Sequence, residues 1–409
     1  MLNRIWGSFF FIACAVALLK GVIWGDHQTW AAMVRALFDM SKTGFEIALG
    51  LTGVMCLWLG VMKIGEKGGA VDLLAKAFGP LLRRLFPGVP AGHPAMGAIV
   101  MNMAANMLGL DNAATPLGLK AMKELQSLNP EKDRATNDQI LFLVINTSAV
   151  TLIPATIFVY RAQMGAADPT DIFLPILIAT FFSSIVGLLV TSVVQRLKIW
   201  DPVVLAYLGG MTTVVVAMMV YFSSLEQEVL ERQSSIVSNF LIFAVIITFL
   251  TLAAQRRVPV YETFVEGAKE GFQVAIGIIP YLVAMLVAIG VLRASGALDL
   301  FLDAVRWGVE RSGLDSRWVD GLPTALMRPL SGSGARGLML ETMEAQGADS
   351  FAGRLVSTIQ GSTETTFYVL AVYFGSVGIR RTRHAIACGL TADVAGAVAA
   401  ILVCYLFFG

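Results

Sequence analysis

Polar and acidic residues inside apolar runs are the features of this sequence that could carry chemistry. Glu364 stands near the middle of the apolar stretch 355–376. A carboxylate at membrane depth is costly, so it indicates a functional group by default. The alternative is a structural ion pair, with Arg328 or Arg336 as the partner. On the functional interpretation, this stretch supplies four substrate contacts: Gln360, Ser362, Thr363 and Glu364.

A second polar cluster lies in the stretch 92–122. Asn102 and Asn106 are one helical turn apart, and the apolar pattern breaks at Gly109–Leu110–Asp111–Asn112 before resuming at Ala113. Neither half reaches the ~20 apolar residues that a full crossing needs, so the stretch predicts a re-entrant hairpin. The amides could instead join helices by hydrogen bonds, and the tip residues could cap the second helix. We predict substrate contacts from Asn106, Asp111 and Asn112.

The stretch 322–344 repeats this design with a different tip. It breaks at Pro329–Gly334, which includes Ser331–Gly332–Ser333–Gly334, and resumes at Ala335. Such a turn is either a flexible tip or a set of free N–H groups for a carboxylate or phosphate. The second interpretation predicts substrate contacts from Ser331, Ser333 and Arg336.

An interrupted span, 138–160, contains neutral oxygen ligands. Pro154 lacks an N–H group and frees a carbonyl about one turn upstream. In the second half, Gly361 weakens the helix of the corresponding span, 355–376. Neutral oxygens suit a hard cation, so we prefer Na⁺ as the coupling ion. The alternative is a proton carried by Glu364. The predicted ion ligands are Asn106, Asn146, Thr147 and Ser148, with Asn146 also facing substrate.

Composition identifies the class of protein. The 409 residues are 56% hydrophobic and 14% charged, against about 25% charged in soluble domains. We predict an all-α polytopic membrane protein with about nine spans and two re-entrant hairpins. A net charge of +1 gives no reason to expect nucleic acid, and neither Cys nor His shows metal-ligand spacing. The predicted spans are 5–24, 45–63, 138–160, 172–194, 203–222, 238–255, 272–293, 355–376 and 384–408.

The chain contains an internal repeat with a shift of about 227 residues. Lys42–Gly50 matches Lys269–Gly277, and Gly69–Leu73 matches Gly296–Leu300. Amphipathic stretches follow at 70–85 and 297–311 and predict interfacial helices. An odd number of spans between the repeats gives inverted topology, with hairpin tips 109–112 and 331–334 facing each other. Loop Lys and Arg residues place the N-terminus in the cytoplasm.

The motifs NMLGLDNAATPLGLKAMKEL and VINTSAVTLIPATI resemble spore maturation protein A, and RPLSGSGARG, GSTETTFYVLAVYFG and LTADVAGAV resemble spore maturation protein B. Both belong with the nucleoside-recognition, or Gate, domains, which are similar to the core of concentrative nucleoside transporters. The resemblance implies a fused chain in a bacterial inner membrane, possessing an elevator-like transport domain. The expected segments are 1–41 (N-terminal span and amphipathic segment), 42–195 (first Gate repeat), 196–260 (two linking spans) and 261–409 (second Gate repeat).

Together these features predict a secondary transporter of a small polar organic solute, coupled to Na⁺ or H⁺. A membrane-embedded enzyme and a non-transporting scaffold are the alternatives. We find no nucleophile–base pair or phosphate loop, so we predict no catalytic residues. We expect no cofactor other than Na⁺. The expected partners are the small-molecule substrate and membrane lipid, and the sequence leaves open whether the protein forms a homo-oligomer.

Overall fold

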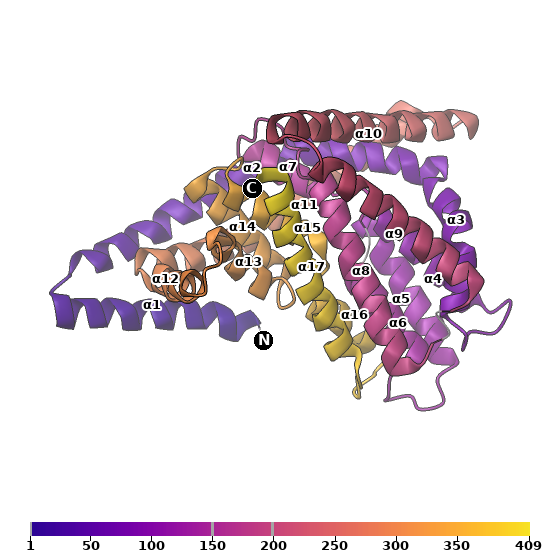
Figure 1. The fold of residues 1–409 in the computed structure, drawn as a ribbon, viewed down its shortest axis with the longest axis horizontal. Coiled ribbons are helices and arrows are strands. Elements are labelled where there is room, and N and C mark those ends of the chain that lie inside the picture. The colour runs from indigo at the N-terminus through magenta and orange to yellow at the C-terminus, as the bar shows by residue number, and fades with distance from the viewer. Residues whose placement is uncertain (1, 149–150, 198–199) are drawn as a thin grey trace.

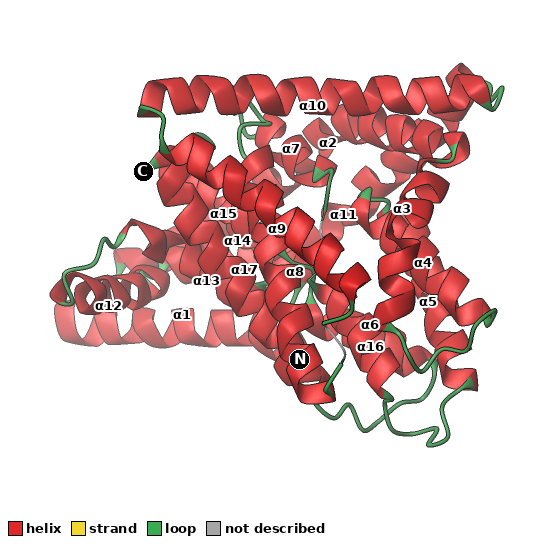
Figure 2. Cartoon of the chain, turned by 45° about the vertical axis from the view of Figure 1, so that its right-hand side comes forward, coloured by secondary structure: helices red, strands yellow, loops and turns green. Residues whose placement is uncertain are grey.

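The computed structural model describes residues 2–148, 151–197 and 200–409, and within these ranges every regular element is a helix (Figure 2). The first half contains α1 (Leu2–Trp24), α2 (Gln28–Gly68), α3 (Ala70–Leu85), α4 (Pro94–Met107), α5 (Asp111–Ser127), α6 (Asn137–Thr147), α7 (Ala155–Gln163) and α8 (Phe173–Gln195). The second contains α9 (Pro202–Ser223), α10 (Gln227–Gln255), α11 (Val260–Ala294), α12 (Ala297–Arg311), a 3-10 turn η1 (Arg317–Gly321), α13 (Leu322–Met327), α14 (Gly332–Gln346), α15 (Phe351–Ser362), α16 (Thr366–Ser376) and α17 (Ala385–Phe408).

Seven helices of the described chain are long and apolar enough to cross a membrane: α1, α2, α8, α9, α10, α11 and α17. This confirms the all-α multi-pass membrane class. The two other predicted spans, 138–160 and 355–376, are each divided into two short helices, α6 with α7 and α15 with α16. Nine spans therefore remains a prediction that counts each divided pair as one crossing.

Both predicted hairpins consist of two short helices. In the first, α4 and α5 are separated at Gly109, which has a φ of 69° and so occupies a conformation that glycine adopts without strain. In the second, α14 begins at Gly332 rather than at the predicted Ala335. The reason is local: the Ser331 hydroxyl accepts the Gly334 N–H at 3.0 Å and caps the helix, so the glycine-rich turn forms its first turn.

The long helices α2 and α11 cross, and their close contacts show the internal repeat in three dimensions. A Cβ atom added at Gly44 would lie 3.1 Å from Cα of Val283, and one added at Gly271 would lie 2.9 Å from Cα of Cys56. Adding 227 to 44 gives 271, and adding 227 to 56 gives 283. The same close contact thus occurs twice, with the halves exchanged. This relation is that of a pseudo-two-fold axis.

A second crossing joins α8 and α17, which lie side by side in the centre of the molecule (Figure 1). A Cβ added at Gly187 would lie 3.0 Å from Cβ of Ala392, and one at Gly396 would lie 3.2 Å from Cβ of Ser183. Adding 209 to 187 gives 396, and adding 209 to 183 gives 392, so this contact also occurs twice with the halves exchanged. Small residues let the backbones approach closely, as is common between membrane helices.

The remaining helices surround these two crossings. In Figure 1, α10 runs along α2, while α1, α12 and the start of α2 form a projection at one side. Helices α3 and α12, predicted to be interfacial, have the predicted bounds, and each follows a glycine with positive φ, Gly69 at 89° and Gly296 at 80°. Helices α6 and α15 of the divided pairs lie against both α8 and α17, and the hairpins pack in turn against the divided helices, where they form the site.

Candidate functional site

The interruptions of the two divided helices meet at the centre of the protein. The Glu364 N–H, in the second interruption, donates a 2.7 Å hydrogen bond to the carbonyl of Thr147, the last residue of α6. Helix α7 resumes after Pro154, as predicted, whereas α15 continues past Gly361 and ends at Ser362. A Cβ at Gly361 would lie 2.7 Å from the Ile176 side chain, so this glycine allows close packing against α8.

The first interruption, and the first turn of α16 directly after the second interruption, are each hydrogen-bonded to the hairpin of the same half. The Leu152 N–H donates to the Met107 carbonyl at 2.7 Å, and the Phe367 N–H donates to the Pro329 carbonyl at 3.1 Å. Gly109 lies against the Ile153 carbonyl, and Gly332 lies against Thr365. Each hairpin tip therefore contacts the interruption of its own half, and the hydrogen bonds pair backbone groups near the helix ends.

A cavity of about 90 Å³ lies between these elements and is lined by both halves. The first half contributes mainly backbone and small side chains around the start of α7, together with Asn106. The second half contributes most of the charged and amide groups. The lining residues are Asn106, Gly109, Thr151, Ile153, Pro154, Ala155, Thr156, Ile157, Arg328, Arg336, Gln360, Gly361 and Glu364.

The asparagines of the first half form a hydrogen-bonded chain. Asn106 Nδ2 donates to Asn146 Oδ1 at 2.8 Å, Asn146 Nδ2 donates to the Phe142 carbonyl at 2.8 Å, and Asn102 Nδ2 donates to the Ala114 carbonyl at 2.8 Å. The Tyr373 hydroxyl, from α16, adds a 3.3 Å bond to Asn146 Oδ1. These amides join helices, and of the three only Asn106 lines the cavity.

Thr147 and Ser148, the other predicted ion ligands, lie directly behind this chain. The Ser148 hydroxyl donates to the Val144 carbonyl at 2.9 Å, and its own carbonyl accepts the Ser184 hydroxyl. The Thr147 hydroxyl is fully buried and has no hydrogen-bond partner among the described residues. Buried polar atoms are rarely left unpaired, so of the predicted ion ligands the Thr147 hydroxyl is the best candidate to contact a bound ion.

In the second half, Glu364 reaches the cavity from the interruption itself. Its carboxylate lies 3.7 Å from the Arg328 guanidinium, and 47% of the side chain is exposed. Arg328 also donates to the Thr363 carbonyl, which fixes the guanidinium beside the interruption. The arginine predicted as a structural partner is therefore present, but at a distance that leaves the carboxylate accessible from the cavity.

The other predicted contacts divide into two groups. Arg336 and Gln360 line the cavity, with the Arg336 guanidinium 5.2 Å above the ring of Tyr160. The serines make local bonds: the Ser362 hydroxyl donates to the Ile359 carbonyl at 2.8 Å, and Ser331 and Ser333 lie 3.3 Å apart at the helix cap. Thr363 is buried. The side chains of Asp111 and Asn112 lie outside the described part of the chain.

Asp393 is a second acid close to the interruptions, and it was not among the predicted site residues. This residue of α17 is 5% exposed, and its Oδ2 accepts the Thr366 hydroxyl at 2.6 Å, directly behind the second interruption. Its Oδ1 has no hydrogen-bond partner within the described ranges. The signal was present in the sequence as an acid in the last apolar run, where it stood nearer the end of the span.

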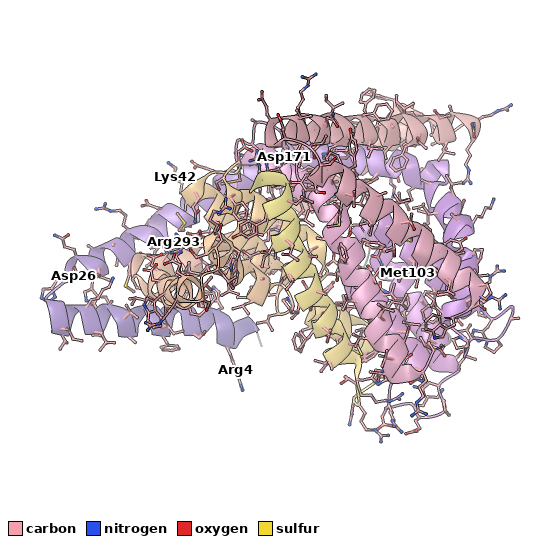
Figure 3. The ribbon with its side chains drawn as sticks, viewed as in Figure 1. Arg4, Asp26, Lys42, Met103, Asp171 and Arg293 are labelled. Carbon is pink, nitrogen blue, oxygen red and sulfur yellow. The ribbon has the colours of Figure 1, made fainter. Side chains whose placement is uncertain are left out.

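A buried charge cluster was not predicted at all. Arg161 is fully buried and lies 2.9 Å from Asp171 and 3.1 Å from Asp349, while Arg354 lies 2.8 Å from Asp171. The cluster joins α7 to the loop before α15, and Figure 3 places Asp171 at the end of the molecule where α17 finishes. Asp171 lies in the loop before α8 and Asp349 in the loop before α15.

The loop between α5 and α6 and the loop between α16 and α17, both expected on the cytoplasmic side of the membrane, contact each other. Asp133 and Arg381 form a 2.7 Å ion pair, and the Arg381 N–H donates to the Asp133 carbonyl at 2.9 Å. The hydrogen bond from the Arg381 guanidinium holds the pKa of Asp133 below its usual range. Both loops carry the positive charges from which we predicted a cytoplasmic position, and their contact is consistent with a shared side.

The fold and the site together define a class: a multi-pass membrane protein built from two inverted halves, each with a hairpin and a divided helix around a central cavity. The chain belongs to the Gate family, described as nucleoside recognition, whose model matches residues 48–165 and 275–380.

Two curated relatives refine this assignment. Spore maturation protein A of Bacillus subtilis (strain 168) is 39% identical over 190 residues, which cover 46% of this chain and 93% of that protein. Spore maturation protein B of the same organism is 51% identical over 154 residues, covering 38% of this chain and 85% of that protein. The matches fall on different parts of the chain, as a fused protein requires. No solved structure gives a significant match.

Proposed function

We propose that this protein is a secondary active transporter of a small polar organic solute, which binds in the central cavity. One observation carries the proposal: polar groups from both inverted halves converge on one cavity at two interrupted helices. Such interruptions mark substrate sites in transporters with inverted repeats. The description of the family, nucleoside recognition, supports a small polar organic molecule as the ligand.

We further propose that transport is coupled to Na⁺, bound near Thr147. The unpaired Thr147 hydroxyl, the carbonyls around Gly109 and the Asn106–Asn146 amides offer neutral oxygen ligands. Hard cations such as Na⁺ take oxygen ligands, and the C-terminal end of α6 adds carbonyls with partial negative charge. The protein would act in a bacterial inner membrane with its N-terminus in the cytoplasm.

Uptake into proteoliposomes tests the proposal against its two alternatives. A transporter concentrates a labelled solute when an inward Na⁺ gradient is imposed. A scaffold produces no flux. An enzyme changes the solute chemically, which analysis of the recovered solute by mass spectrometry would reveal. The absence of flux for neutral, anionic and zwitterionic polar solutes alike would contradict the transporter proposal.

A further inference from the structure

One cationic group in the central cavity has no paired carboxylate among the side chains that the structure describes. Arg336 has no ion-pair partner within 4 Å among the carboxylates whose positions the structure gives, although it stacks on Tyr160. Arg328, the other arginine of the cavity, is already beside Glu364 and bonded to the Thr363 carbonyl. A guanidinium presents five donors in a planar fork that matches carboxylate and phosphate oxygens. Arg336 therefore has spare donors facing the site.

The position of Arg336 strengthens this observation. A second cavity of about 120 Å³ adjoins the first, and both are lined by Gly109, Ala155, Thr156 and Arg336. Two acids line the second cavity, but Lys63 pairs with both of them, at 3.1 Å from Glu270 and 3.4 Å from Glu66. The acids near Arg336 are thus occupied by another cation. Arg336 stands at the junction of the two spaces, where a solute would meet it.

Two independent features point to the same binding position. The first turn of α7 lines the cavity, and Pro154, the residue before it, provides no side-chain cap, so the Ala155 and Thr156 N–H groups have no partner within the helix. A helix N-terminus favours an anion. Gln360 is 3% exposed and lines the same cavity, and its Oε1 has no partner in the described part of the protein. That oxygen requires a donor from the ligand.

We propose that the solute is a small organic anion that also carries hydrogen-bond donors, such as a hydroxy acid or a sugar phosphate. Its carboxylate or phosphate binds Arg336 and the first turn of α7. Its hydroxyl or amino groups donate to Gln360 Oε1 and to the Glu364 carboxylate. This inference rests on the proposed transport function and adds the chemical class of the substrate.

The experiment uses full-length protein in proteoliposomes and four labelled probes of related shape. Glycerate and glycerol 3-phosphate carry both the anion and the donors, propionate carries the anion without hydroxyls, and glycerol carries hydroxyls without charge. We expect uptake of glycerate or glycerol 3-phosphate, which also distinguishes a carboxylate site from a phosphate site. Propionate and glycerol are expected to show no protein-dependent uptake above that of empty liposomes.

Arg336→Gln should weaken uptake of the anion by about 10- to 100-fold, as expected for loss of a hydrogen bond to a charged group. Arg311→Gln is the matched control, because Arg311 also lies 5.2 Å above an aromatic ring, that of Trp307, but is exposed on α12. The control should transport normally. A second measurement, the thermal stability of the purified protein with and without glycerate, keeps the test valid if Arg336→Gln inserts poorly.

The outcomes separate this inference from the function on which it rests. Undiminished anion uptake by Arg336→Gln would overturn the inference. So would concentration of glycerol, or of the neutral nucleoside uridine, in preference to both anions, although transport itself would then stand. If none of these five solutes is concentrated, the inference fails, and the proposed function fails with it only if zwitterionic polar solutes are not concentrated either.

Discussion

The two interrupted helices share one backbone plan but differ in the chemistry of their side chains. The first interruption, 148–154, is surrounded by neutral amides and hydroxyls, with Asn106 and Asn146 at its centre. The second, 363–365, holds Glu364 beside Arg328 and has Asp393 behind it. In each half a backbone N–H, from the first interruption or from the first turn of α16 after the second, bonds to a hairpin carbonyl. The backbone contacts are alike while the side chains differ, and in the function proposed above the first half would bind the cation and the second the solute.

A single pair of equivalent positions shows how far this divergence goes. The shift of 209 that relates Gly187 to Gly396 also relates Ser184 to Asp393. Ser184 donates a hydrogen bond to the Ser148 carbonyl, whereas Asp393 accepts one from Thr366. The same place therefore holds a donor in one half and a charged acceptor in the other. A symmetric backbone can thus support a site with unequal ends.

The largest expected effect on transport comes from removing the charge of the second interruption. Glu364→Gln should abolish or uncouple transport, with a loss in uptake of about 100-fold, since hydrogen bonds to charged groups contribute about 1.5–3 kcal/mol. The protein should still insert normally, because half of the side chain is exposed to the cavity. Proteoliposome uptake and the yield of monodisperse protein would be measured together.

Glu46→Gln is the matched control for this variant, because Glu46 forms an exposed pair with Lys42 at 3.6 Å, nearly the length of the Glu364–Arg328 pair. It should leave transport unchanged. If Glu364→Gln instead folds poorly while its folded fraction transports normally, Glu364 is only a partner for Arg328 and the two interruptions are functionally alike.

The next effect concerns the cluster that ties α7, after the first interruption, to the loop before α15. Arg161→Met should destabilise the protein by about 3–5 kcal/mol, because two aspartates lose a fully buried cation. Unfolding in mixed detergent micelles with increasing dodecyl sulfate would measure this. Arg306→Met, which also removes two aspartate pairs but at a partly exposed arginine, should cost about 1 kcal/mol or less. Equal losses would show that the Arg161 cluster has no special role in joining the halves.

The smallest expected effect lies in the neutral half. Asn146→Ala removes the acceptor for Asn106 and Tyr373, and should raise the Na⁺ concentration for half-maximal uptake by about tenfold, the loss of roughly one buried hydrogen bond. Asn239→Ala, which removes three hydrogen bonds of an exposed amide, is the control. Replacing Na⁺ by choline at fixed pH should remove concentrative flux in the unmodified protein. Flux that survives choline but collapses with the pH gradient would transfer the coupling role to Glu364.

Much of the framework was predictable because it depends on local patterns. Apolar runs located the seven long helices, glycine-containing breaks located both hairpins, and polar residues with Pro154 and Gly361 indicated the divided helices. The boundary at Gly332 was wrong by three residues because a serine cap competes with the preference of glycine for a loop. The Arg161 cluster was not foreseeable, since its members come from separate loops and only folding brings them together. The sequence likewise could not indicate which oxygens, such as Gln360 Oε1, are left without partners.

The position of α9 has a consequence for how the two halves stay together. This helix is mostly exposed and contacts α3 through few groups, among them Tyr207, whose hydroxyl donates to the Ala77 carbonyl at 2.6 Å. With α10 it forms the covalent connection between two halves that complete one cavity. Linking the partners makes their association intramolecular, at an effective concentration that for short tethers is of order millimolar. Formation of the complete cavity therefore does not depend on the protein concentration, and one copy of each half is present at every expression level.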